Sequence, residues 1–119
     1  MRKNEFDDYI VRGWESGANL FYDGRIYFSQ CDYIEENKHF HFYVYSFKAK
    51  KYEDNSFSPY MHRNGGYVED AKLIDKIFET KDEAKKLYFS SKIFDGKSFW
   101  EIGMDFEWLE DDGPIIYVD

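Results

Sequence analysis

The sequence predicts a single α+β domain in which helices pack on one face of a small, mainly antiparallel sheet. Aromatic residues make up 22% of the 119 residues and alanine occurs at four positions, a balance that favours strands over a helical bundle. The length suits one domain, covering residues 1–119. The expected order is a helix, three strands, a segment that fits either helix or strand, two helices and a last strand.

The first expected helix covers residues 4–13. Asn4 can cap it, while Tyr9 and Ile10 share an apolar face with Phe6. Gly13 is a suitable end, because glycine adopts the backbone conformation that closes many helices.

A hairpin is expected next, because Asp23-Gly24 separates the apolar runs 18–22 and 25–31. The acidic segment 32–38 is expected to be a loop. Residues 39–48 (HFHFYVYSFK) give the clearest strand in the chain. Its side chains alternate between two sets, with Phe40, Phe42 and Val44 on one side and Tyr43, Tyr45 and Phe47 on the other. Rings on both sides indicate a strand covered twice, or one covered face and one contact surface.

The second half of the chain is less regular. Residues 48–66 are expected to form a loop, with Pro59 and the run 64–66 as breakers, and residues 68–78 fit either a helix or a strand. A capping box at residues 80–83 predicts a helix over 81–89. A second box at residues 98–101 opens a helix that reaches residue 112, where Gly113 and Pro114 follow. Residues 115–118 are expected to be a terminal strand or an ordered tail.

The charge is concentrated in this last part. Residues 98–119 contain seven acidic residues and no basic one, whereas the rest of the chain is nearly balanced, with 17 acids and 16 bases. On a helical wheel, Phe99, Ile102, Phe106 and Leu109 form one apolar stripe, which suits a core. Trp100, Met104 and Trp108 form a second stripe on nearly the opposite side.

The second stripe is the predicted protein-binding site, because tryptophan anchors with a charged rim suit the recognition of a basic partner. Two alternatives remain open: other parts of the fold cover the stripe, or a second copy covers it in a homodimer. The predicted site residues are Trp100, Met104, Trp108, Glu101, Asp105, Glu107, Asp111 and Asp112.

Bulk properties argue against several other classes of protein. A pI near 4.9 disfavours direct binding of nucleic acid, which requires a basic surface. The sequence has neither an apolar run of membrane-spanning length nor a recognisable signal peptide, so we expect a soluble, cytoplasmic protein. Cys31 is the only cysteine, which excludes an internal disulfide.

The chain also offers weak candidates for chemistry. His39 and His41 share a strand face, and Cys31, Asp32 and His62 could complete a metal site with them. Cys31 beside either of the two strand histidines could act as a nucleophile. No phosphate-binding loop or paired zinc-ligand motif supports such chemistry, so we expect no metal, no cofactor and no catalytic residue.

Three short motifs occur together along the chain. They are Glu5-Phe6-x-x-Tyr9-Ile10-x-x-Gly13, Phe21-Tyr22-Asp23-Gly24-Arg25-x-Tyr27 and Phe94-Asp95-Gly96-Lys97-Ser98-x-x-Glu101-Ile102. The arrangement resembles small uncharacterised single-domain proteins of Gram-positive bacteria and their mobile elements. Many acidic proteins of this size and source look like immunity proteins, so the resemblance implies an immunity-type role and no particular site residue.

Together these features predict a non-enzymatic acidic protein that binds a basic protein, as a bacterial immunity or inhibitor-type protein does with a nuclease toxin. One alternative is an anti-defence or regulatory protein of a phage or mobile element that mimics the charge of nucleic acid and binds a nucleic-acid-binding effector. Another is a small-ligand binder or enzyme that uses the aromatic sheet face.

Overall fold

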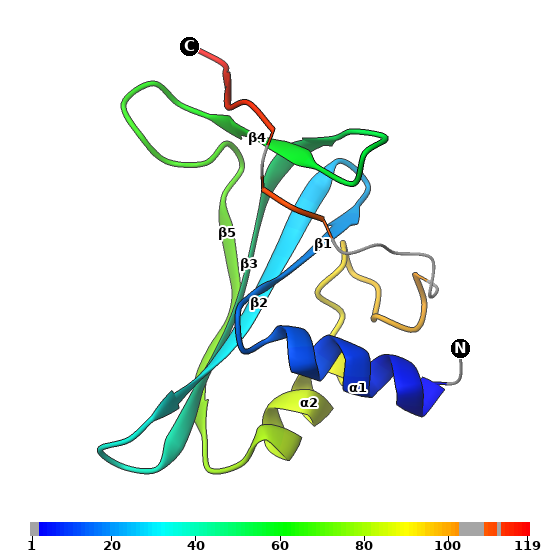
Figure 1. Ribbon diagram of the computed structural model, residues 1–119, viewed down its shortest axis with the longest axis vertical. Helices are drawn as coiled ribbons and strands as arrows, with labels where there is room; N and C mark the ends of the chain where they lie inside the picture. Colours follow the sequence, from blue (N-terminus) through cyan, green and yellow to red (C-terminus); the bar gives the residue numbers. More distant parts are fainter. Residues whose placement is uncertain (1–2, 103–108, 112) are drawn as a thin grey trace.

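The computed structural model describes residues 3–102, 109–111 and 113–119. Figure 1 shows strands that run the length of the molecule, with both helices at one end. In chain order the elements are α1 (Lys3–Gly13), β1 (Ala18–Tyr22), β2 (Arg25–Ile34), β3 (His39–Lys51), β4 (Phe57–Met61), β5 (Ala71–Phe78), α2 (Lys81–Ser90) and β6 (Ile116–Tyr117). The predicted α+β class with a mainly antiparallel sheet is confirmed.

The sheet is organised around β3. Its strands follow the order β1-β2-β3-β4-β6, and β5 also pairs with β3. All pairings are antiparallel except that of β4 with β6. The expected β1–β2 hairpin is confirmed, and Asp23 and Gly24 have φ values of 48° and 79°. Two successive positive φ angles are typical of the type I′ turn that Asp-Gly favours.

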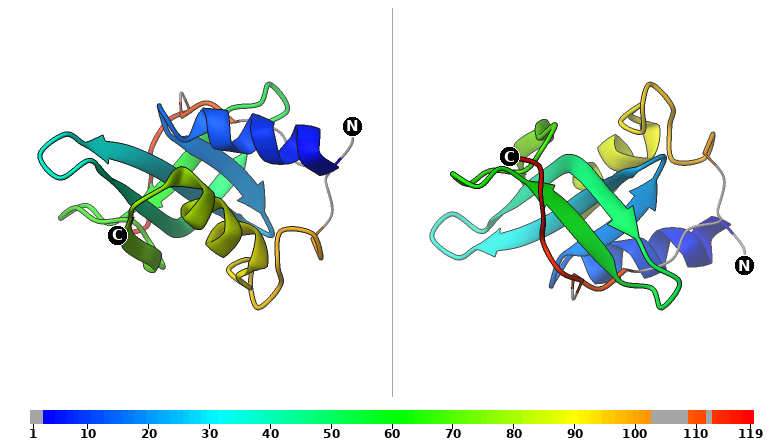
Figure 2. Two further views of the ribbon diagram at one scale, coloured as in Figure 1. Left: turned by 90° about the horizontal axis from the view of Figure 1, so that it is seen from below. Right: turned by 90° about the horizontal axis from the view of Figure 1, so that it is seen from above.

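One core cluster joins the helices to the sheet. Ile10 and Trp14, from α1 and the residue that follows it, and Tyr88 from α2 are at most 1% exposed. They share the cluster with strand residues such as Phe42 and Val44. Figure 2 shows both helices in front of the strands when the molecule is seen from below and behind them when it is seen from above.

A second core cluster contains side chains of the opposite orientation on the strands. Ile26 and Phe47 pack there with Ala49, Phe57 and Leu109. In the view from above, β4 and the C-terminal segment cross in front of the sheet (Figure 2). Phe40 and Phe42 of β3 therefore pack with the first cluster, and Tyr45 and Phe47 pack with the second, as the period of two along a strand requires.

Several strand boundaries differ from the expectation. The long β2–β3 pairing continues to Ile34 and His39, so the segment predicted as a loop over 32–38 shrinks to a short turn. The expected loop over 48–66 contains the end of β3 and all of β4. Pro59 is tolerated in β4 although it lacks an N–H group to donate, and Phe57 anchors the strand because it is buried. Residues 71–78 form a strand, which resolves the ambiguity of segment 68–78.

The prediction of a helix over residues 98–112 is wrong at its far end, for the residues that the structure describes there. The capping box does form, because Glu101 N donates to Ser98 Oγ at 3.3 Å and Ser98 N donates to Glu101 Oε2 at 3.0 Å. Residues 99–101, however, form only a turn. Further along, the N–H groups of Leu109 and Glu110 donate to the carbonyls of Asn19 and Asn55. These distant partners replace the hydrogen bonds that a helix would make.

Candidate functional site

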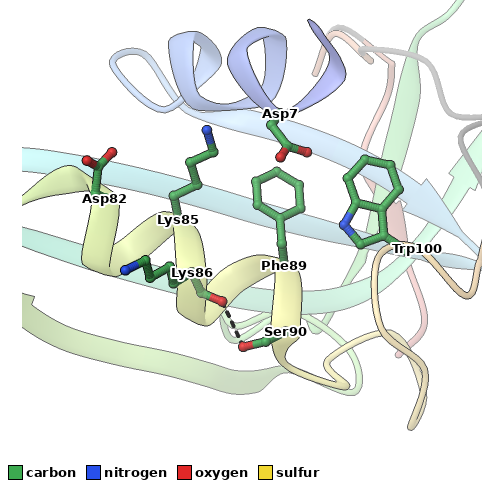
Figure 3. A pocket seen from close by; sticks show the side chains of 7 residues that line it. All are labelled: Asp7, Asp82, Lys85, Lys86, Phe89, Ser90 and Trp100. Carbon is green, nitrogen blue, oxygen red and sulfur yellow. Dashed lines mark hydrogen bonds between the residues drawn. The ribbon is translucent and has the colours of Figure 1, made fainter. Parts of the chain in front are cut away.

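Trp100 is the one predicted anchor among the described residues, and it is half-buried. Its ring stacks on Phe89 with 5.7 Å between centroids and 23° between planes, and it meets Phe99 edge-on at 5.0 Å. Figure 3 shows Trp100 and Phe89 side by side in a cleft between α1 and α2. Trp100 thus packs against the helix-side core instead of standing clear of it.

The cleft beside Trp100 has no excess of negative charge. The charged side chains that line it are two acids and two bases: Asp7, Asp82, Lys85 and Lys86. A basic partner would find no net attraction there among the described residues.

Two of the other predicted site residues are described, and five lie outside the described residues. Glu101 is exposed and completes the capping box with Ser98. Asp111 is exposed near the second core cluster, where its negative charge raises the pKa of Tyr45 and of Tyr67. Met104, Asp105, Glu107, Trp108 and Asp112 lie outside the described residues. Among those described, Trp100 and Glu101 lie in the turn at residues 99–101, and Asp111 lies on the C-terminal segment.

The alternative sites built on cysteine and histidine are not assembled. Cys31 pairs with Phe42 and lies in the helix-side core, where burial raises the pKa of its thiol. His41 is the neighbour of Phe42, so its side chain points to the other face of the sheet. His62 pairs with Asp119 at 3.2 Å. Within the described ranges, no group of three His, Cys, Asp or Glu side chains is placed to hold a metal ion.

A continuous row of rings lies on the sheet face opposite the helix-side core. We call it the aromatic face, and it consists of Phe28, Tyr43, Tyr45, Phe47 and Tyr67. Tyr43 and Tyr45 lie parallel, with 2° between their planes and 6.5 Å between centroids. Phe28 stacks on Tyr45 at 4.8 Å, and Tyr67 stacks on Phe47 at 4.2 Å. Apart from the buried Phe47, the rings are half-buried, so they retain surface for a partner.

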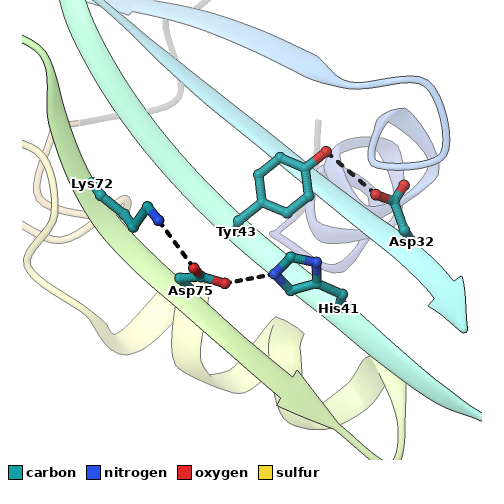
Figure 4. A network of polar contacts seen from close by, with 5 residues as sticks. All are labelled: Asp32, His41, Tyr43, Lys72 and Asp75. Carbon is teal, nitrogen blue, oxygen red and sulfur yellow. Dashed lines mark hydrogen bonds and ion pairs between the residues drawn. The ribbon is translucent and has the colours of Figure 1, made fainter. Parts of the chain in front are cut away.

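A polar network borders the aromatic face (Figure 4). The hydroxyl of Tyr43 donates to Asp32 Oδ2 at 3.3 Å. Burial and then the charge of Asp32 raise the pKa of Tyr43 to about 12, so this hydroxyl keeps its proton at neutral pH. On β5, Asp75 lies opposite Tyr43 and contacts His41 Nε2 at 2.5 Å and Lys72 Nζ at 3.2 Å.

The Asp75 carboxylate determines that the Nε2 atom of His41 carries a proton. Hydrogen bonds from His41 and then from Lys72 hold the pKa of Asp75 below its usual value, so it is ionised and can only accept. His41 Nε2 must therefore carry the proton that it shares with Asp75. The imidazole is held beside Tyr43, with 5.0 Å between ring centroids.

Two further carboxylates raise the pKa of the tyrosines at the other end of the aromatic face. Burial, then Tyr67, Asp70 and Asp111 raise the pKa of Tyr45. Burial, then Asp111 and Asp70 raise the pKa of Tyr67. Carboxylates therefore flank the rings at both ends, with Asp32 and Asp75 at one and Asp70 and Asp111 at the other.

No protein family, curated protein sequence or solved structure matches the chain. None of the helices formed by the described residues is long and apolar enough to cross a membrane.

Sequence reasoning identified three of the five rings of the aromatic face and missed part of its border. The period of two along residues 39–48 placed Tyr43, Tyr45 and Phe47 on one side, and that arrangement is observed. Asp75 and Lys72 were missed, because their segment could not be assigned to a strand. Recognising 71–78 as a strand would have been the necessary signal, since the pairing of β5 with β3 brings Asp75 opposite Tyr43.

Proposed function

We propose that this protein is a non-enzymatic binding module for a basic protein, of the immunity or inhibitor type, and that the aromatic face makes the contact. The single observation that carries the proposal is the row of half-buried rings between two pairs of carboxylates. Tyrosine rings contribute large contact areas at interfaces, and carboxylates at their border select cationic partners.

The chain already uses its tyrosines in this way within its own fold. Lys48 Nζ lies 4.9 Å from the centroid of Tyr60, and Lys50 Nζ lies 5.3 Å from that of Tyr52. Both distances are within the range of cation–π attraction. A partner rich in lysine and arginine can make the same contacts with Tyr43 and Tyr45.

The formal charge of −8 supports the proposal at longer range. Carboxylates flanking a partly apolar surface accelerate the encounter with a basic protein and orient it, while the rings supply most of the affinity. In this proposal α1 and α2 cover one face of the sheet, which is supported by the core cluster they share with it. The half-buried rings of the opposite face are then the part that a partner meets, because Phe47 is already buried in the second core cluster.

The proposal is tested by capturing a partner from cells of the organism that encodes the chain and measuring its dissociation constant. The face variant combines Asp32→Asn, Asp70→Asn and Asp111→Asn. The control variant combines Glu35→Gln, Glu36→Gln and Glu79→Gln, three exposed acids outside the aromatic face. Both variants remove three negative charges, so an effect of net charge alone is equal in the two.

We expect a basic partner whose affinity falls about tenfold or more in the face variant and much less in the control. A captured partner that is acidic, or equal losses in the two variants, would contradict the proposal.

A further inference from the structure

The aromatic face contains a pocket between β3 and β5. It has a volume of about 320 Å³ and is lined by Asp32, His41, Tyr43, Val44, Tyr45, Lys72 and Asp75. Tyr43 and Tyr45 project from the same side of β3, and β5 places Asp75 opposite Tyr43 and Lys72 opposite Tyr45. Figure 4 shows the polar groups of this pocket gathered around the Tyr43 ring.

The rings favour a flat ligand. Their planes differ by 2° and their centroids are 6.5 Å apart, so the two rings present parallel faces along β3. A planar group that stacks on one of these rings is therefore parallel to the other ring as well.

The charges favour a cation. Asp32 and Asp75 contribute two negative charges and Lys72 contributes one positive charge, so one negative charge remains when His41 is counted as neutral. The Lys72 side chain is 71% exposed, so it can leave Asp75 for solvent at little cost. Both carboxylates present acceptor oxygens at the edge of the pocket.

Arginine combines the two requirements. Its guanidinium is planar and always charged, it stacks on aromatic rings, and its N–H groups form paired hydrogen bonds with a carboxylate. We propose that this pocket receives an arginine side chain of the partner, stacked on Tyr43 and Tyr45 and hydrogen-bonded to Asp75. The origin of the arginine rests on the proposed function, whereas the chemistry of the pocket does not.

The test uses small probes on the whole chain, followed through the ring resonances of Tyr43 and Tyr45 by NMR. N-acetyl-arginine amide is compared with the citrulline analogue, which is planar and uncharged, and with the lysine analogue, which is charged and not planar. We expect saturable shifts with arginine at a dissociation constant on the order of millimolar, and binding about tenfold weaker for citrulline. Lysine is expected to fall between them.

Variants identify the groups involved. Asp75→Asn should weaken arginine binding, Tyr43→Leu should abolish it, and Tyr43→Phe should retain most of it because the ring remains. Glu79→Gln, an exposed acid just beyond β5, is the matched control and should change nothing.

The pocket proposal is overturned if citrulline binds as tightly as arginine, or if arginine causes no saturable shift in the wild type. Neither comparison depends on whether a variant folds. A basic partner that still distinguishes the face variant from its control would then leave the proposed function intact. Arginine binding without any basic partner would instead refute the proposed function alone.

Discussion

The rings of Tyr43 and Tyr45 lie parallel on one side of β3, with 6.5 Å between their centroids. Two residues of one strand necessarily share a face when a single residue separates them. Phe28 supports Tyr45 from β2, and the hydrogen bond to Asp32 holds the hydroxyl of Tyr43. The surface is thus fixed by the sheet itself, which limits the entropy lost when a partner binds.

The raised pKa of Tyr43 predicts a loss of stability in alkali. Its folded pKa is about 12 against an ordinary value of 10, so the unfolded chain releases the proton first as the pH rises. The stability that the protonated Tyr43 hydroxyl contributes is fully present below pH 10 and is lost between pH 10 and about 12. Between pH 8 and pH 11, the free energy of unfolding measured in urea should fall less for Tyr43→Phe than for the wild type. Equal losses would show that Tyr43 does not carry this effect.

Gly17 should tolerate alanine much less well than Gly24. Both have positive φ angles, which cost an alanine on the order of 1–2 kcal/mol. At Gly17, a Cβ would also lie 2.6 Å from Phe28 Cε2, whereas at Gly24 nothing lies within 4 Å. We expect Gly17→Ala to lower the free energy of unfolding by about 3 kcal/mol and Gly24→Ala by about 1 kcal/mol. Similar values would mean that Phe28 moves aside freely.

Trp100 should act mainly on stability, since it packs against Phe89 and Phe99. We expect Trp100→Ala to reduce the free energy of unfolding by about 2 kcal/mol, less than for a fully buried tryptophan. Tyr33→Ala, at a ring that is 53% exposed, serves as the control and should cost well under 1 kcal/mol. If Trp100→Ala folds as stably as the wild type and releases the partner, the original stripe hypothesis regains its support.

Asp119 joins the C-terminal segment to the residues that follow β4. It accepts from Arg63 N at 2.9 Å and contacts His62 Nδ1 at 3.2 Å, and these bonds hold its pKa below the usual value. The stability that the ionised Asp119 contributes is therefore present above the ordinary pKa of an aspartate. It is lost as the pH falls through the lowered pKa of Asp119 in the folded chain. Hydrogen exchange should show that Asp119→Asn weakens protection of the Val118 amide, which donates to Met61 O. Unchanged protection would show that the backbone pairing suffices.

Local signals predicted the elements that depend on local chemistry. Asp23-Gly24 formed the expected hairpin, and Thr80 with Glu83 capped the expected helix α2. The box at Ser98 and Glu101 also formed, yet the helix predicted from it does not reach Leu109. The reason is that Asn19 and Asn55, which are far away in sequence, supply the hydrogen-bond partners of residues 109 and 110.

In the candidate site, too, local sequence predicted some positions, and tertiary pairing determined the others. Alternation along β3 was enough to place Tyr43 and Tyr45 together. The position of Asp75 depends on the register of β5 against β3, which shifts between Val44 and Tyr45. An irregularity of this kind depends on tertiary pairing, so the residues 68–78 alone could not reveal it.

The most direct test of the central claim is hydroxyl-radical footprinting of the chain with and without its captured partner. We expect that the partner protects Tyr43 and Tyr45 from oxidation, while Trp100 reacts at the same rate in both states. Protection of Trp100 with no change at Tyr43 and Tyr45 would contradict the claim and place the contact at the cleft between the helices.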